Sequence, residues 1–267
     1  METELEPFSD IHGFERRCGT LSPDAGMLRA FAAMPGALPD YTDSQIRELI
    51  TDPARVKMKD IFGKLWIQNQ LSFGSCNGWG TTGCLGRARF LAGIRDMLQF
   101  SGSYVYSWIN GNRDQGSMLS DGLTEIGIHG APPVALNPAN KIYRSQIPAS
   151  VDAEAAKYKG LVQYPVKTLQ GLKTALARNM PCVVAVHASS NFQRANSKGV
   201  AGADNGPGNH AVCCEDIEII DGELVYRIAN SWGVSFGVDG YIYVREATFR
   251  QTFPNHTFWA LAAIQEG

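Results

Sequence analysis

Apolar residues recur along this chain first at helical spacing and later at strand spacing. Between residues 76 and 100 they return every three or four positions among several glycines, which predicts a long and largely buried helix. The same spacing predicts helices over residues 120–130 and 169–179, and a short helix over residues 42–50. Helices are therefore expected mainly before residue 180.

The period changes to that of strands after residue 180. Residues 182–186 form a continuous apolar run typical of a short buried strand, and another strand is expected to begin at residue 210. Residues 218–228 have the pattern of a hairpin whose Asp221 and Gly222 supply positive φ, and residues 240–245 predict a further strand. Helices first and antiparallel strands later predict an α+β fold with a cleft between its two halves.

The N-terminal 55 residues differ from the rest of the chain because they contain clusters of proline and glycine and only one helical pattern. We expect residues 1–55 to be an extension that packs on a main domain of residues 56–267. Within that domain the helical half is expected to span about residues 56–165 and the β-rich half about residues 166–267. No internal repeat or low-complexity segment interrupts this division.

Composition narrows the possible partners. Of the 267 residues 44% are hydrophobic and 19% charged, and the net charge of -2 gives no electrostatic reason to expect nucleic acid as a partner. The acidic N-terminus lacks the basic and apolar regions of a secretory signal. No run of eighteen apolar residues is present, so no membrane association is expected. These features predict a soluble protein in a reducing, intracellular compartment.

Six cysteines and five histidines are the candidate ligands for disulfides or metals. The cysteines are irregularly spaced and the expected compartment is reducing, so we expect free thiols and no disulfide framework. No CxxC pair occurs, and the histidines lack ligand spacing, so no metal is expected. No cofactor is predicted either.

One cysteine is well placed to be a nucleophile. Cys76 follows a Gly-Ser pair and opens the long predicted helix, where unsatisfied amides and the helix dipole lower the pKa of a thiol. Gln70 precedes it by six residues, close enough to direct its amide toward the space in front of the sulfur. Together with the Cys76 backbone N–H it would form an oxyanion hole, in which single donors typically contribute about 3 to 4 kcal/mol.

Two further residues complete a candidate site. His210 begins a predicted strand and Asn230 ends a later one, so neighbouring strands would place the two side chains together. The carbonyl of an asparagine accepts the imidazole N–H without adding a negative charge that would weaken a thiolate–imidazolium pair.

These residues lie in four motifs that resemble those of the papain family of cysteine peptidases, in the order of that family. His210 follows Cys76 by 134 residues, within the roughly 130 to 150 residues typical of papain and cathepsins. The resemblance covers about residues 60–250 and implies a helical left half, a barrel-like right half and Cys76 opposite His210 in the cleft. The motifs are Asn69-Gln70, Gly74-Ser75-Cys76, Asn209-His210-Ala211-Val212 and Asn230-Ser231-Trp232-Gly233.

The chain also departs from the family pattern. Asn77 replaces the usual Trp after the nucleophile, and Phe73 stands where secreted relatives often carry a disulfide cysteine. With one short helix in its first 55 residues, the chain is not expected to carry the long inhibitory propeptide of lysosomal relatives. Residues 110–117 and 199–202 are more similar to papain-like proteins of bacteria and tailed phages, which suggests a protein carried in a phage particle with other virion proteins as partners.

Several other polar residues have simpler structural interpretations. Cys213 and Cys214 are expected to pack on opposite faces of a strand. Asp114 and Asp121 have neighbours typical of turns and helix caps rather than of catalytic bases. By the family resemblance, Trp232 covers the hydrogen bond between the candidate histidine and asparagine from water.

The resulting hypothesis is a papain-like cysteine endopeptidase that uses Cys76, His210, Asn230 and Gln70 on peptide or protein substrates. The thiol attacks an amide carbonyl, the imidazole protonates the leaving amine, and water hydrolyses the thioester. Two alternatives remain open. One is a structural or virion component that retains the fold without proteolysis, and the other is an amidase acting on peptidoglycan or isopeptide bonds.

Overall fold

A computed structural model describes residues 5–22, 40–202 and 206–266. Residues 1–4 and 23–39 of the expected N-terminal extension lie outside the described part. Across the described residues no helix combines the length and apolarity needed to cross a bilayer.

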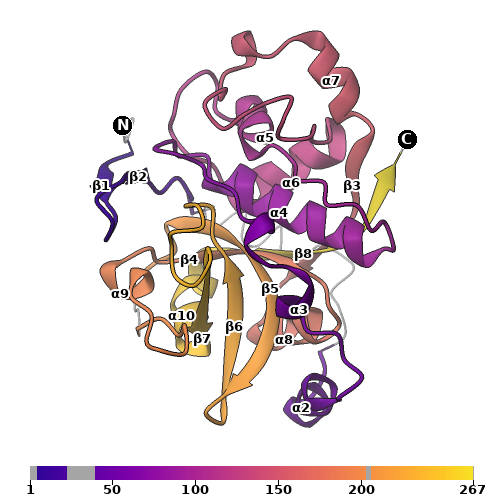
Figure 1. Cartoon of the computed structure of the whole chain (residues 1–267), viewed down its shortest axis with the longest axis vertical. Coiled ribbons are helices and arrows are strands. Elements are labelled where there is room, and N and C mark those ends of the chain that lie inside the picture. Colours follow the sequence, from indigo (N-terminus) through magenta and orange to yellow (C-terminus); the bar gives the residue numbers. More distant parts are fainter. Residues whose placement is uncertain (1–4, 23–39, 203–205, 267) are drawn as a thin grey trace.

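The chain has an α+β architecture in which a helical half lies against a half built on one sheet (Figure 1). The sheet has six antiparallel strands in the order β3-β8-β4-β5-β6-β7. In chain order these strands are β3 (Tyr158–Val166), β4 (Cys182–Val186), β5 (His210–Ile220), β6 (Glu223–Ala229), β7 (Tyr241–Arg245) and β8 (Phe258–Glu266).

The helices divide between the two halves. The helical half contains α4 (Cys76–Leu91), α5 (Gly102–Ile109), α6 (Leu119–Ile128), the 3₁₀ helix η2 (Arg144–Gln146) and α7 (Ala149–Ala155). The other helices in the described part of the chain are α2 (Asp43–Thr51), α3 (Met58–Ile61), η1 (Lys64–Trp66), α8 (Leu169–Ala177), α9 (Ser190–Gln193), α10 (Glu246–Thr252) and η3 (Phe253–Asn255).

The long helix predicted over residues 76–100 is shorter in the structure, and this prediction was wrong at its C-terminal end. Helix α4 ends at Leu91, and Gly93 follows with φ of +104°, a conformation that a right-handed helix does not adopt. The sequence pattern did not predict helix α5, because its Tyr, Val, Trp and Ile residues each have a high propensity for strands. Strand β3 was missed as well, and it joins the sheet although it begins before the expected boundary near residue 165.

The other predicted elements agree with the structure. Helices α2, α6 and α8 lie within one or two residues of the predicted ranges, and β4 has the predicted bounds. Asp221 and Gly222 form the turn between β5 and β6 with φ of +53° and +81°. Positive φ at both positions fits the twist of the hairpin and fixes its register.

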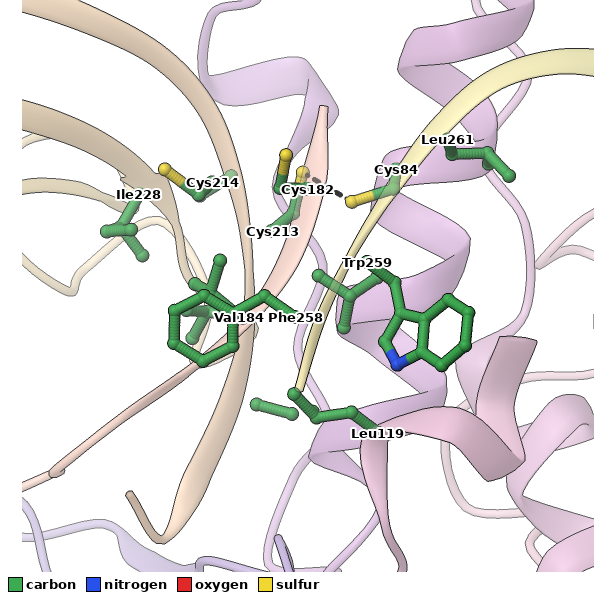
Figure 2. Close-up of a cluster of buried hydrophobic side chains, with 14 of the residues drawn as sticks. Cys84, Leu119, Cys182, Val184, Cys213, Cys214, Ile228, Phe258, Trp259 and Leu261 are labelled. Atoms are coloured by element: carbon green, nitrogen blue, oxygen red, sulfur yellow. Dashed lines mark hydrogen bonds between the residues drawn. The ribbon is translucent and has the colours of Figure 1, made fainter. Parts of the chain in front are cut away.

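Helix α4 packs across the sheet and forms the core between the two halves. It can approach β5 closely because Gly80 lies where an added Cβ would be 3.2 Å from the backbone of Val212. Cys84 on α4 contacts Cys213 on β5, with 3.3 Å between the sulfurs (Figure 2). Leu85 is fully buried beside them, and burying such a side chain contributes about 2 kcal/mol. The middle of α4 therefore packs directly against the first residues of β5.

The described N-terminal residues contact both halves. Strands β1 (Pro7–Ser9) and β2 (Glu15–Arg17) form a small antiparallel sheet, seen beside the boundary between the halves in Figure 1. Helix α2 packs on α8, and its Thr42 and Gln45 form a capping box.

Candidate active site

Cys76 is the first residue of α4 and is fully buried. The loop before it is fixed from two sides, because the Gly74 amide donates to Asp114 Oδ1 at 2.9 Å and Trp79 Nε1 donates to Ser75 Oγ at 3.2 Å. The sulfur therefore has a defined place at the positive end of the helix dipole.

His210 begins β5 and is also fully buried. Its Nε2 lies 2.8 Å from Asn230 Oδ1, which also accepts the Ser231 amide at 2.8 Å. Because that amide oxygen can only accept, Nε2 carries a proton. Trp232 stacks on the imidazole with 4.7 Å between ring centroids and shields this hydrogen bond.

The remaining ring nitrogen, His210 Nδ1, is buried and has no hydrogen-bond partner among the described residues. The thiols of Cys76 and Cys18 both interact with this imidazole. Nδ1 is therefore the atom available to exchange a proton with sulfur.

Gln70 lies beside the same group of residues. Its backbone amide donates to Ser231 O at 2.8 Å, and its Oε1 accepts from the Ser231 hydroxyl at 2.6 Å. This second bond fixes the orientation of the side-chain amide, so that Nε2 donates to Phe73 O at 2.7 Å and to Arg17 O at 3.2 Å. The structure thus brings together all four side chains named from the sequence.

The environment of the site changes the acidity of both the thiol and the imidazole. Burial alone would raise the pKa of Cys76, but His210, the Ala211 amide and the Thr20 hydroxyl stabilise the thiolate and lower the pKa to about 7. Burial alone would lower the pKa of His210, but the thiols of Cys18 and Cys76 raise it to about 10. Between these pH values the thiolate–imidazolium pair is the favoured form.

Residues 16–21, which we call the inserted segment, lie between the two halves and against this site. On the helical side the Ser117 amide donates to Gly19 O at 2.6 Å, and the Leu21 amide donates to Ser117 O at 2.9 Å. On the sheet side the Thr20 amide donates to Asn209 O at 3.1 Å. The inserted segment is therefore bound through its backbone to both halves of the molecule.

The inserted segment also contacts the nucleophile directly. The Gly19 amide donates to Cys76 Sγ at 3.4 Å, and the Thr20 hydroxyl lies 3.5 Å from the same sulfur. An added Cβ at Gly19 would overlap Gly74 O, so this close approach requires glycine. The sulfur faces an amide nitrogen, whereas the carbonyl next to Gln70 belongs to Arg17. In a cleavable substrate, the Cys76 sulfur and Gln70 Nε2 would contact the same peptide unit. Here they contact two different peptide units, so the segment does not lie as a cleavable substrate would.

Arg16 fixes the N-terminal end of the inserted segment. Its guanidinium donates to Asp10 Oδ2, Asn69 Oδ1 and Trp232 O, each at 2.9 Å, and the residue is only 3% exposed. Phe8 packs edge-on against Trp232 with 5.6 Å between centroids. These contacts connect the inserted segment to the residues that hold Gln70 and Asn230.

Among the other residues considered from the sequence, Asp121 and Asn77 have structural roles, whereas Asp114 contacts the inserted segment. Asp121 Oδ2 accepts the Met118 amide and caps α6, as its neighbours predicted. Asn77, in the place of the usual Trp, donates to Ser117 Oγ at 3.0 Å and supports the residue that pairs with the inserted segment. Asp114 neither caps a helix nor stabilises a local turn, because its carboxylate contacts Gly74, Tyr106 and Arg17. No group of three or more potential ligands in the described part of the chain is arranged to hold a metal ion.

A family model described as papain family cysteine protease matches residues 64–255. The matched stretch includes Gln70, Cys76, His210 and Asn230. This chain belongs to the papain family of cysteine proteases. Its helical half, its sheet and its helix beginning at a cysteine are the papain-like fold that the motifs implied.

Relatives of known sequence or structure show how far the similarity extends. Cathepsin K of Mus musculus is 37% identical over 92 residues, which make up 33% of this chain and 28% of that protein. The match thus spans less than a third of the length of that relative.

Solved structures show the same papain-like fold over most of the chain. Xylellain, a cysteine protease from Xylella fastidiosa, has a TM-score of 0.64 at 20% identity and covers 86% of this chain and 96% of its own. The cysteine protease and lectin-like domains of Cwp84, a surface layer associated protein of Clostridium difficile, have a TM-score of 0.62 at 15% identity, with 75% and 49% covered.

No sequence pattern predicts the inserted segment. Cys18, Gly19 and Thr20 have neither apolar periodicity nor a motif, and their contacts with Cys76 join residues 56 or more positions apart. The only available signal was Cys18 itself, the one cysteine that precedes Cys76 in the sequence.

Proposed function

We propose that Cys76, His210, Asn230 and Gln70 hydrolyse peptide bonds and that the protein is a cysteine endopeptidase. The observation that carries this proposal is a buried thiol at the start of α4 facing an imidazole whose other nitrogen is held by Asn230 at 2.8 Å. The lowered pKa of Cys76 and the raised pKa of His210 support a thiolate–imidazolium pair at neutral pH.

The reaction follows from the position of the protons. The Cys76 thiolate attacks the carbonyl carbon, and the developing oxyanion takes hydrogen bonds from Gln70 Nε2 and the Cys76 amide. The His210 imidazolium gives its Nδ1 proton to the departing amine, which leaves a thioester. Water then loses a proton to Nδ1 and hydrolyses the thioester, restoring the thiolate–imidazolium pair.

We further propose that the conformation described here is self-inhibited. The inserted segment binds Ser117, Asn209 and Cys76, which are groups that a substrate backbone would need to reach. Arg17 O of the same segment also accepts a hydrogen bond from Gln70 Nε2. A substrate must displace these contacts, so catalysis requires the inserted segment to leave.

Labelling with a peptidyl chloromethyl ketone tests this function in the full chain. Cys76 should be alkylated much faster than the buried Cys84, and His210→Ala should slow Cys76 labelling without changing that of Cys84. Cysteine peptidase function would be rejected if Cys76 reacted no faster than Cys84. That result would favour a structural or virion component, whereas cleavage of purified peptidoglycan in place of a peptide library would favour an amidase.

A further inference from the structure

Asp114 is a carboxylate at the edge of the active site, and its side chain is only 9% exposed. Its Oδ1 accepts two hydrogen bonds, from the Gly74 amide at 2.9 Å and from the Tyr106 hydroxyl at 2.9 Å. Tyr106 is held in turn, because its hydroxyl accepts the Gly116 amide at 2.8 Å. The carboxylate is thus fixed in the wall that contacts the inserted segment.

The second oxygen, Oδ2, lies toward the inserted segment. It is 3.4 Å from Nη1 of Arg17, whose side chain is one-third exposed. A cation beside a carboxylate that little water screens interacts with it favourably. When the inserted segment leaves, Arg17 leaves with it, and Oδ2 loses this cation.

Arg17 also connects this carboxylate to the reacting position. Its carbonyl oxygen accepts from Gln70 Nε2 at 3.2 Å while its side chain reaches Asp114. In the proposed reaction the carbonyl beside Gln70 belongs to the residue that becomes the acyl group. Although the inserted segment as a whole does not lie as a substrate would, Arg17 shows that a residue whose carbonyl accepts from Gln70 can place a cation beside Asp114.

Resting on the proposed function, we propose that Asp114 determines specificity and favours substrates with Arg or Lys at the residue whose carbonyl is attacked. The cation of the substrate would replace Arg17 at Oδ2. Oδ1 would remain on Gly74 and Tyr106, so the recognition needs no rearrangement of the wall.

Paired peptides test this preference. Substrates that differ only in Arg or citrulline at the acyl residue have nearly the same shape but differ in charge. We expect kcat/KM to be about tenfold higher for the Arg peptide, as for a partly exposed charge pair. In Asp114→Asn, which retains the Oδ1 acceptor, the ratio of kcat/KM for the Arg peptide to kcat/KM for the citrulline peptide should fall to about one.

Other outcomes overturn the specificity proposal. Equal cleavage of the two peptides by the wild type would do so, as would an equal loss of both in Asp114→Asn, because that pattern indicates only support of Gly74. Failure of the protein to cleave any peptide, with Cys76 unreactive, would instead reject the proposed function. Arg and citrulline chloromethyl ketones give an independent readout, since their labelling of Cys76 needs no turnover.

A separate observation concerns a second thiol in the site. Cys18 immediately precedes Gly19, whose amide nitrogen is 3.4 Å from Cys76 Sγ. The Cys18 Cα is two covalent bonds, about 2.4 Å, from that nitrogen and thus within about 6 Å of the sulfur. Both thiols interact with the His210 imidazole. This geometry is compatible with a disulfide between the two cysteines.

We propose that a low-molecular-weight disulfide such as oxidised glutathione converts Cys18 and Cys76 into a disulfide that locks the inserted segment in place. Cys18, the more exposed of the two, exchanges with the oxidant and its proton goes to the first thiol released. The Cys76 thiolate then attacks the Cys18 sulfur and expels the second thiol, which takes the proton from His210. One glutathione disulfide becomes two thiols as two protein thiols become one disulfide.

Peptide mapping of the oxidised full chain tests this proposal. After incubation with oxidised glutathione, a peptide linked through Cys18 and Cys76 is expected, together with loss of Cys76 alkylation that dithiothreitol reverses. Cys213→Ser removes a thiol from the buried pair with Cys84 and should still yield the peptide linked through Cys18 and Cys76. Cys18→Ser should not yield it. Linkage of Cys76 to another cysteine, or no linked peptide in the wild type, would overturn the proposal.

Discussion

At the scale of single residues, the site depends on where one proton resides. Asn230 accepts from His210 Nε2 and thereby directs Nδ1 toward sulfur, while Trp232 excludes water from that bond. Burial strengthens the interaction between the thiolate and the imidazolium, because little solvent screens it. The acidity of each group consequently depends on the presence of the other.

This coupling predicts a bell-shaped pH dependence for alkylation of Cys76. The rate should rise as pH passes about 7, because Cys76 becomes a thiolate, and fall as pH passes about 10, because His210 loses its proton. The measurement is the second-order rate of labelling by a chloromethyl ketone across this range. In His210→Ala the acidic limb should shift upward, and an unchanged profile would contradict the pairing.

Asn230→Ala should reduce reactivity without unfolding the protein. Removing Oδ1 leaves a buried imidazole N–H without an acceptor, which costs about 1 to 3 kcal/mol. The expected loss in the labelling rate of Cys76 is roughly 5- to 150-fold. Circular dichroism should remain that of the wild type, and restored labelling in Asn230→Gln would support a role in positioning His210, whereas a wild-type rate in Asn230→Ala would exclude that role.

At the scale of elements, access to the site is controlled by the inserted segment. It is anchored by Arg16 at one end and paired with Ser117 near the other, while Gly19 permits its close approach to Cys76. These contacts are mostly hydrogen bonds rather than apolar burial, so the segment can be released without disrupting the core.

Arg16→Ala should therefore activate the protein. Loss of the bonds to Asp10, Asn69 and Trp232 should release the inserted segment more often and raise the rate of Cys76 alkylation about tenfold, as expected for a loss of about 1.4 kcal/mol of segment binding.

Arg47→Ala, an exposed arginine on α2, is the matched control and should label at the wild-type rate. Labelling of Arg16→Ala at or below the wild-type rate, in a protein with unchanged thermal stability, would count against self-inhibition.

At the scale of the whole molecule, the site exists only while the two halves are held together. Glu215 on β5 pairs with Arg87 on α4 and with Arg227 on β6, and all three are almost completely buried. This cluster joins the helix that carries the thiol to the sheet that carries the imidazole.

Glu215→Gln should lower the free energy of unfolding by about 3 to 5 kcal/mol, since it leaves two buried arginines without a counter-charge. Glu223→Gln, which affects the exposed pair with Arg245, is the control and should cost less than about 1 kcal/mol. Urea unfolding measures both variants. Equal effects of the two substitutions would show that the buried cluster does not stabilise the junction.

Much of this architecture could be predicted from the sequence because it depends on local signals. The apolar periodicity predicts α8 and β4, and the Asp221-Gly222 pair predicts the hairpin turn. The residues around Cys76 and His210 indicate the family. Elements without such signals were missed: α5 is helical because it packs between other helices, and β3 is a strand because β8 pairs with it. Tertiary contacts override weak local propensity in both cases.

The sequence by itself therefore determined the fold class, most elements and the motifs that contain the four proposed site residues, because helix starts, strand patterns and spaced motifs are properties of short stretches. Only the tertiary structure decided that residues 16–21 lie against Cys76 and that Asp114 contacts Arg17. These contacts join distant residues in extended backbone with no period of its own. Their partners are chosen by the shape and charge of surfaces that exist only after the chain has folded.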